Sequence, residues 1–191
     1  VAKPGAVATP VVLIQAPQEA VGVPPRCIPV LQLPGMDGEL PAAGHVDARA
    51  GRWAGEAVEW AARAALAGDL AGLVTAPLHK EALSAAGAPF DRYPGHTELL
   101  QAEAARFLGK GVGEVPVRMM LANDELRTVL VSIHMSLRRA IEAVTFDNVL
   151  QTLQITHAAL ARVLGRPRRI GVAGLNPHAG EGGLFGDEEQ A

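Results

Sequence analysis

Apolar residues recur along the chain with two spacings, one typical of helices and the other typical of short buried strands. Between residues 50 and 67 they recur every three or four positions, with Trp53 and Trp60 on one side, and Gly68 ends the run. This spacing predicts a helix over residues 50–67. The same signals predict further helices over residues 80–86, 97–107, 137–143 and 148–164. Thr97 is expected to cap the third of these five helices, with Glu98 in its first turn.

Short apolar runs between the helices predict strands. They cover residues 11–14, 27–33, 70–74, 117–122, 127–134 and 170–175. The turn-forming residues Asn123, Asp124 and Glu125 lie between two of these runs and predict a β-hairpin. Strands that alternate with helices are typical of an α/β fold with a mostly parallel sheet and an antiparallel part.

Composition narrows the class of protein. The 191 residues are 49% hydrophobic and 19% charged, which is ordinary for a globular chain. A net charge of −3 gives no basic field that would favour nucleic acid. No apolar run reaches the roughly 20 residues of a membrane helix. Cys27 is the one cysteine, so no intramolecular disulfide can form. We therefore expect a cytoplasmic protein with no nucleic-acid or membrane partner.

The two ends of the sequence predict an incomplete chain. The first residue is Val1 and not methionine, and residues 187–191 resemble the opening of a helix that then stops. We expect a partial N-terminal region over residues 1–43 and an α/β core over residues 44–191.

Two histidines are placed alike. His134 and His178 each end an apolar run that predicts a strand. Strand carboxyl ends are where open α/β sheets bind ligands, and neutral imidazole is a common ligand of divalent metals. Either histidine alone is more often structural, but the matched placement favours a shared metal ion.

A second candidate site lies at a predicted helix start. His96 and Thr97 put two hydrogen-bonding side chains where unpaired N–H groups and a partial positive charge attract anions. His79 and Lys80 could also face an anion, although such a pair is more often a solvated helix start. The glycines of residues 180–183 resemble a phosphate-binding loop only weakly, because the spacing of the known fingerprints is missing.

Longer motifs contain these residues. They read Val-Thr-Ala-Pro-Leu-His-Lys-Glu-Ala-Leu at 74–83, Gly-His-Thr-Glu at 95–98, Asn-Pro-His-Ala-Gly-Glu at 176–181 and Phe-Gly-Asp-Glu-Glu at 185–189. In content and order the motifs resemble the 4-hydroxythreonine-4-phosphate dehydrogenase family of pyridoxal phosphate biosynthesis. The resemblance runs from about residue 44 to the end of the chain, and residues 1–43 carry little of it.

The resemblance implies an α/β/α layered fold like that of the isocitrate and isopropylmalate dehydrogenases, in a homodimer with active sites at the subunit interface. It implies oxidation and decarboxylation of 4-phosphooxy-L-threonine, with NAD or NADP as the cofactor. It also implies a divalent metal, Zn, Mg, Mn or Co, held by three histidines. By motif, His134 and His178 match two of the metal ligands, and His96 and Thr97 match substrate-binding residues.

Parts of the family pattern are missing from this sequence. The third metal histidine and much of the cofactor-binding part lie in motifs that this family carries further along its chain. We therefore expect residues 1–191 to carry part of a site.

Several alternatives remain open at the level of sequence. The nearest is a related dehydrogenase that acts on a 4-phosphorylated erythronate or threonate. A different class is a metal-dependent hydrolase built on the same two histidines, and another is a phospho-ligand binding domain without catalysis.

Overall fold

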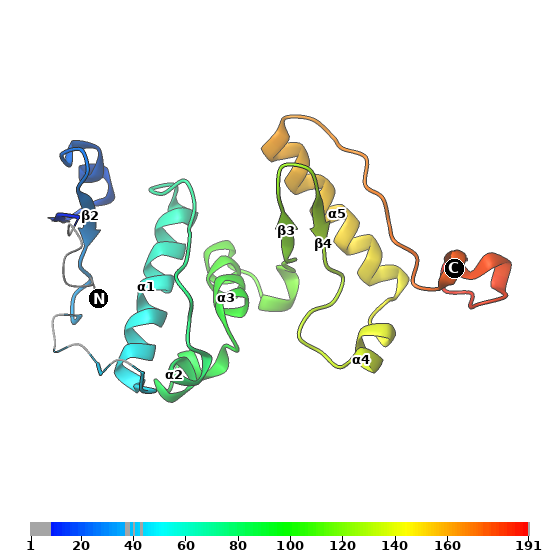
Figure 1. Cartoon of the computed structure of the whole chain (residues 1–191), viewed down its shortest axis with the longest axis horizontal. Helices are drawn as coiled ribbons and strands as arrows, with labels where there is room; N and C mark the ends of the chain where they lie inside the picture. The colour runs from blue at the N-terminus through cyan, green and yellow to red at the C-terminus, as the bar shows by residue number, and fades with distance from the viewer. Residues whose placement is uncertain (1–8, 37–38, 40, 43, 191) are drawn as a thin grey trace. The chain divides into compact units, whose positions relative to one another are not determined.

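The computed structural model describes residues 9–36, 39, 41–42 and 44–190 (Figure 1). The chain divides into two compact units, Val1–Pro116 and Val117–Ala191, which we call the N-terminal unit and the C-terminal unit. Each is described by itself, and the boundary expected after residue 43 stays a prediction. None of the helices in the described part of the chain combines the length and the apolar character that a bilayer span needs.

Parallel and antiparallel strand pairing are both present, in agreement with the predicted α/β fold. The strands are β1 (Val11–Ile14), β2 (Ile28–Leu31), β3 (Met120–Ala122) and β4 (Arg127–Val129). β1 pairs with β2 in parallel, with Val11 opposite Ile28. β3 pairs with β4 in antiparallel fashion, with Met120 opposite Val129. Asn123 closes this hairpin, because its Oδ1 accepts hydrogen bonds from the backbone of Glu125 and Leu126 at 2.9 and 2.7 Å.

The helices in the described part of the chain are α1 (Ala48–Ala67), α2 (Lys80–Ala85), α3 (His96–Leu108), α4 (Leu137–Glu142) and α5 (Phe146–Leu164). Four of these five helices begin at a capping side chain, and α1, α3 and α5 end at a glycine. Short 3-10 turns are η1 (Pro17–Gly22), η2 (Phe90–Arg92), η3 (Val112–Glu114) and η4 (Pro177–Gly183). Asp47 caps α1 by accepting a hydrogen bond from the Ala50 backbone at 2.9 Å, and Gly68 ends that helix at a positive φ of 90°.

The core of the N-terminal unit lies among α1, α2 and α3. Its buried members are Val58, Leu83, Ala86, Phe90 and Leu99. The helices approach closely because α1 carries two glycines on its buried face. A Cβ on Gly51 would lie 1.8 Å from the Ala82 carbonyl oxygen, and a Cβ on Gly55 would lie 2.6 Å from the Phe90 ring. Any other residue at these two positions would push α1 away from its neighbours.

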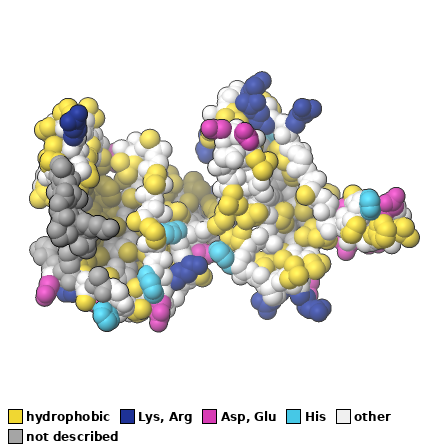
Figure 2. Space-filling model, in the orientation of Figure 1, with side chains coloured by type: hydrophobic (Ala, Val, Ile, Leu, Met, Phe, Trp, Pro, Cys, Tyr) yellow, Lys and Arg dark blue, Asp and Glu magenta, His cyan; other side chains and the backbone are white. Residues whose placement is uncertain are grey.

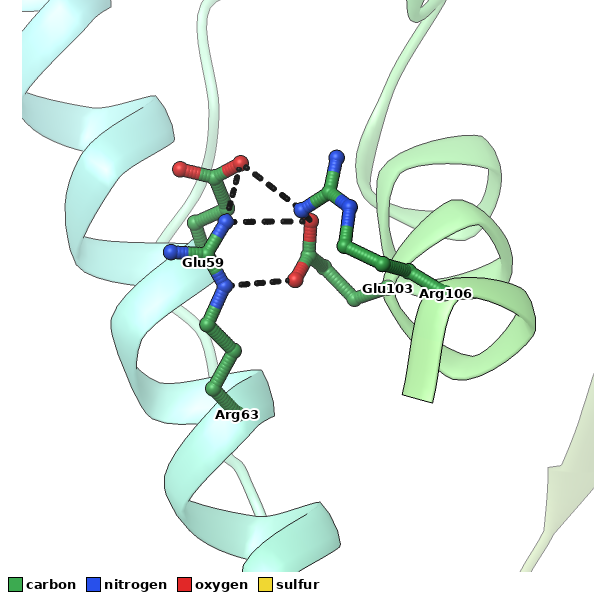
Figure 3. Close-up of polar contacts among 4 residues, drawn as sticks. All are labelled: Glu59, Arg63, Glu103 and Arg106. Atoms are coloured by element: carbon green, nitrogen blue, oxygen red, sulfur yellow. Dashed lines mark hydrogen bonds and ion pairs between the residues drawn. The ribbon is translucent and has the colours of Figure 1, made fainter. Parts of the chain in front are cut away.

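A cluster of charged residues, which we call the α1–α3 ion cluster, links α1 to α3 (Figure 3). Its members are Glu59, Arg63, Glu103 and Arg106. The Glu103 side chain is 1% exposed, and Arg63 Nε donates to it at 2.7 Å. Arg106 donates to the other Glu103 oxygen. The hydrogen bond to Glu103 raises the pKa of Arg63 above its usual value, against the opposing effect of burial.

In the C-terminal unit, Arg118 lies two residues before β3 and links this segment to α5. The Arg118 guanidinium donates to Thr152 Oγ1 at 2.7 Å, and to Asn148 Oδ1 and Gln151 Oε1 at 2.8 Å each. All three acceptors are neutral side chains on one face of α5. Thr145 caps this helix by accepting a hydrogen bond from the Asn148 backbone.

Two strand predictions are wrong, and three others are too long, among them residues 27–33, of which β2 covers Ile28–Leu31. Residues 70–74 and 170–175 form no hydrogen-bonded strand with any part of the described chain. A strand exists only where a neighbour pairs with it, and neither apolar run has one here. Residues 170–173 instead line an open groove of about 830 Å³ with β4 and α5. The hairpin strands are shorter than expected, because their ladder pairs only three residues on each side.

Candidate substrate and metal site

The start of α3 presents unpaired backbone donors. The helix begins at His96, and Gly95 precedes it without any side chain that caps the end. Within the helix, the first backbone bond runs from Leu99 N to Gly95 O at 3.3 Å. The N–H groups of His96, Thr97 and Glu98 therefore have no partner in the helix, and they carry the positive end of the helix dipole. Such a helix end is suited to an anionic group.

Thr97 does not cap α3, contrary to the sequence prediction. The residue lies inside the first turn and is partly buried, and Gly95 occupies the capping position. The prediction failed because the capping position is Gly95, two residues before Thr97. The Thr97 hydroxyl makes no hydrogen bond to the end of the helix among the described residues, so it remains available for a ligand.

His96 has a ring nitrogen that lacks a partner. The residue is partly buried, and its Nε2 is shielded from solvent with no hydrogen bond to any described residue. An unsatisfied buried polar atom costs about 1–3 kcal/mol, so such atoms usually have a partner in the working protein. A bound substrate is one group that would provide it.

Lys80 lies beside the same helix start. A Cβ on Gly95 would lie 3.8 Å from Lys80 Cε and 3.7 Å from Glu98 Oε2, so the lysine side chain passes next to the first turn of α3. His79 has a different task, because its Nδ1 accepts a hydrogen bond from the Ala82 backbone at 3.2 Å and caps α2. The structure thus brings Lys80 next to the first turn of α3, while it gives His79 a structural role.

His134 lies on an exposed loop between β4 and α4. Its backbone has a φ of 53°, in the left-handed region that few residues other than glycine adopt. Ser136 then caps α4 by accepting a hydrogen bond from the Arg139 backbone at 3.4 Å. The imidazole is exposed and open to a ligand.

His178 lies in an unusual left-handed turn, residues 177–183, which we call the His178 turn. Positive φ angles run from His178 through Gly183. Three of these residues carry side chains, namely His178, Ala179 and Glu181, and each costs about 1–2 kcal/mol in this conformation. The His178 side chain is 72% exposed, and its Nδ1 lies 3.7 Å from Glu181 Oε2. The Phe185 ring lies 6.0 Å away, centroid to centroid.

The His178 turn is closed by what we call the Asn176 clamp, formed by Asn176 with Glu188 and Glu189. Asn176 donates three hydrogen bonds to the two carboxylates, one from its backbone and two from its side-chain amide. The bond from the Asn176 backbone lowers the pKa of Glu189 below its usual value, and the side-chain bond adds to the effect. Gly186 makes room for the amide, because a Cβ there would lie 2.4 Å from Asn176 Nδ2.

The described residues do not form a complete metal site. Among residues 9–36, 39, 41–42 and 44–190, no three or more His, Cys, Asp or Glu side chains gather in a way that would hold an ion. His134 and His178 fit a divalent metal in kind, because both offer exposed imidazoles, but two ligands are too few. Their shared ion stays a prediction, as do the substrate roles of His96 and Thr97, which lie in the other unit.

Sequence reasoning did not identify the Asn176 clamp or the place of Lys80. A signal for the clamp was present, since an asparagine opens the motif and two glutamates follow 12 and 13 residues later. For Lys80, no spacing rule relates the start of α2 to the start of α3, because the contact depends on how the two helices pack.

Three comparisons relate the chain to known proteins. A family model described as pyridoxal phosphate biosynthetic protein PdxA matches residues 5–191. A 4-hydroxythreonine-4-phosphate dehydrogenase of Beijerinckia indica subsp. indica is 52% identical over 151 residues, which cover 78% of this chain and 41% of the relative. A D-threonate 4-phosphate dehydrogenase of Pectobacterium atrosepticum is 39% identical over 177 residues, which cover 93% of this chain and 51% of the relative.

Solved structures agree with these relatives. A crystal structure of 4-hydroxythreonine-4-phosphate dehydrogenase from Klebsiella pneumoniae matches with a TM-score of 0.78 at 37% identity, and the match covers 95% of this chain and 51% of that one. The corresponding enzyme from Burkholderia phymatum matches with a TM-score of 0.74 at 36% identity. The chain spans about half the length of the proteins it matches.

Proposed function

Because the chain belongs to the pyridoxal phosphate biosynthetic protein PdxA family, we propose that the whole protein is a dehydrogenase of a small phosphorylated hydroxy acid. The favoured reaction is the oxidation, with decarboxylation, of 4-phosphooxy-L-threonine. The relative with 52% identity is named for that substrate, and a relative with 39% identity is named for D-threonate 4-phosphate. D-Threonate 4-phosphate, or the matching erythronate, is therefore the alternative substrate.

The observation that supports a phosphorylated acid most directly is the start of α3. At this helix start the N–H groups have no partner in the helix, His96 Nε2 has no hydrogen bond to any described residue, and the Lys80 side chain passes next to Gly95. Together they offer hydrogen-bond donors and positive charge to an anion. In this proposal His96 and Thr97 bind and orient the substrate, and Lys80 draws one of its anionic groups to the helix end.

His134 and His178 are proposed to hold a divalent metal, with further ligands from elsewhere in the whole protein. Imidazole nitrogen suits Zn and Co, and the two side chains are exposed. When bound, the metal stabilises negative charge on the substrate oxygens, and NAD or NADP accepts the hydride. No described residue is assigned to the nicotinamide cofactor.

A homodimer with active sites at its interface is also part of the proposal. Apolar side chains lie open on α4 and α5, where Leu137 is 79% exposed, Phe146 67% and Val163 75%. Figure 2 shows hydrophobic side chains open on the viewed face of both units. Exposed apolar surface of this kind is typical of a face that another part of the assembly covers.

One assay separates these possibilities. NADH formation, followed by its absorbance, is measured for the whole protein with 4-phosphooxy-L-threonine, D-threonate 4-phosphate and D-erythronate 4-phosphate, each with and without a chelator. We expect the first substrate to give the highest rate and the chelator to abolish it. A higher rate with either sugar-acid phosphate would replace the favoured substrate by the alternative. A hydrolase or a phospho-ligand binding domain would give no NADH with any of the three.

A further inference from the structure

We propose that Asn176 is the positioning residue of the metal ligand His178. By holding the carboxylates of Glu188 and Glu189, it preforms the left-handed turn that presents the imidazole before any metal binds. The inference rests on the proposed function, in which His178 binds a divalent ion.

The Asn176 clamp uses every donor that the residue has. The Asn176 backbone N–H donates to Glu189 Oε1 at 2.7 Å, and Nδ2 donates to Glu189 Oε2 at 3.0 Å and to Glu188 Oε2 at 2.6 Å. Each acceptor is a carboxylate, so these are charge-assisted hydrogen bonds. They join the first residue of the loop to residues 12 and 13 positions later, and the His178 turn lies between these contacts.

The closed loop fixes the surroundings of the imidazole. The Ala179 backbone donates to Asn176 O at 3.1 Å, and the Phe185 backbone donates to Gly180 O at 3.1 Å. The second bond folds Phe185 back beside the His178 ring. Glu181 faces His178 Nδ1 at 3.7 Å, which leaves Nε2 as the nitrogen open to a metal. A carboxylate near the second ring nitrogen is the usual companion of a metal-bound histidine.

An asparagine suits this position better than an aspartate does. An aspartate has the same shape, but it would bring a third carboxylate against Glu188 and Glu189 and would lose the Nδ2 donor. The amide also needs the space above Gly186, where a Cβ would lie 2.4 Å from Nδ2. Three residues of the His178 turn carry side chains at positive φ, a conformation that is unfavourable by itself. Contacts from outside the turn are therefore needed to stabilise it.

The test compares Asn176→Asp and Asn176→Ala with the unaltered whole protein, using two readouts. The first is hydrogen exchange of the Phe185 and Ala179 amides in the metal-free protein, and the second is Co²⁺ affinity followed by the visible absorption of the bound ion. We expect both variants to exchange these amides about tenfold faster or more. We expect the Co²⁺ dissociation constant to rise about 10- to 100-fold, as it does when partners of metal ligands are removed.

Two further variants serve as control and rescue. Asp187→Asn removes a neighbouring carboxylate that makes no side-chain hydrogen bond among the described residues, and it should change neither readout. Combining Asn176→Asp with Glu188→Gln and Glu189→Gln reverses donor and acceptor, because the amides introduced at positions 188 and 189 can donate to the carboxylate introduced at position 176, while the amide oxygen at position 189 still accepts from the backbone. We expect this triple variant to recover part of the Co²⁺ affinity that Asn176→Asp loses, and the absence of any recovery would overturn the assignment.

His178→Ala separates this inference from the proposed function. If that variant binds Co²⁺ as well as the unaltered protein does, the metal role of His178 is wrong, and its positioning falls with it. If His178→Ala loses affinity but Asn176→Asp keeps it, the positioning role alone is overturned.

The exchange of α5 amides reports whether a variant is folded. Should Asn176→Asp fail that check, Glu189→Gln decides, because it removes one clamp bond and should weaken Co²⁺ binding in the same direction.

Discussion

His96 and Thr97 illustrate, at the scale of single residues, how a helix start can be left open for a ligand. His96 has a shielded nitrogen without a described partner, and Thr97 is not needed as a cap because Gly95 occupies that position. We predict that His96→Ala or Thr97→Val raises the substrate KM or lowers kcat in the whole protein. Thr97→Val should change the free energy of unfolding by no more than about 0.5 kcal/mol.

Thr97→Ser is the matched control, because it keeps the hydroxyl and removes only a methyl group. It should retain most of the activity that Thr97→Val loses. Unchanged steady-state kinetics in both His96→Ala and Thr97→Val would contradict a role of this helix start in substrate binding.

The pH dependence of the His178 turn depends on Glu189, a second single residue. Its pKa is lowered by the Asn176 hydrogen bonds, so its contribution to the clamp is present above the ordinary glutamate pKa of about 4.3. The contribution is lost as the pH falls through the lower pKa of the folded state. We predict that the Asn176 side-chain amide signals in an NMR titration stay constant from neutral pH to about pH 5 and shift below it. A shift centred near neutral pH would contradict this assignment.

At the scale of secondary-structure elements, the contact of α1 with α3 pairs a buried carboxylate with two exposed arginines. Glu103 is 1% exposed, whereas the Arg63 and Arg106 side chains that pair with it are 55% and 54% exposed. Removing both arginines leaves a buried carboxylate without a partner, so Arg63→Ala with Arg106→Ala should lower the free energy of unfolding by about 3–5 kcal/mol. Glu103→Leu leaves the arginines free to turn to solvent, and it should be neutral within about 1 kcal/mol or stabilising.

Urea denaturation measures the free energy of unfolding of the double arginine variant and of Glu103→Leu, so that the two losses can be compared. Arg106→Ala alone serves as the intermediate, because Arg63 still pairs with Glu103 there. An equal loss of stability in Glu103→Leu and in the double arginine variant would show that the cluster stabilises the helix pair through the ion pairs themselves.

The close approach of α1 to α2 gives a second prediction for the elements. Gly51→Ala places a Cβ 1.8 Å from the Ala82 carbonyl oxygen, so the two helices must move apart. The gain of about 1 kcal/mol in helix propensity is smaller than the cost of such overpacking, about 1–3 kcal/mol or more. We predict a net loss of stability and a lower Tm. Ala57→Gly, at an exposed position of α1, is the control and should cost only about 0.5–1 kcal/mol.

The sequence predicted the helices well and the strands poorly, and the reason is physical. A helix is set by neighbours in the chain, so the spacing of apolar residues and the stops at Gly68 and Gly165 mark α1 and α5 in the sequence. A strand depends on a partner that the sequence does not reveal, and residues 70–74 have none in the described chain. In the site, the motif located His178, but the left-handed turn could not be predicted, because its closure depends on contacts with residues 188 and 189.

At the scale of the whole molecule, the small number of metal ligands gathered among the described residues predicts how residues 1–191 behave alone. The chain spans about half the length of its relatives, and its described residues gather no group of three metal ligands. We predict that residues 1–191 expressed by themselves bind Co²⁺ weakly, reduce no NAD and bind a dye for apolar surfaces. The open side chains of Leu137, Phe146 and Val163 provide that surface. Dehydrogenase turnover by these residues alone would show that they suffice for catalysis.

The Asn176 clamp also bears on the chemical ageing of the protein. Asparagine deamidates mainly when the backbone N–H of the next residue attacks the side-chain amide and forms a cyclic imide. The chain has three asparagines, and Asn176 is the one that precedes a proline, whose nitrogen carries no hydrogen for this attack. The residue whose conversion to aspartate would open the His178 turn is thus the one whose covalent neighbour blocks the common route to that lesion.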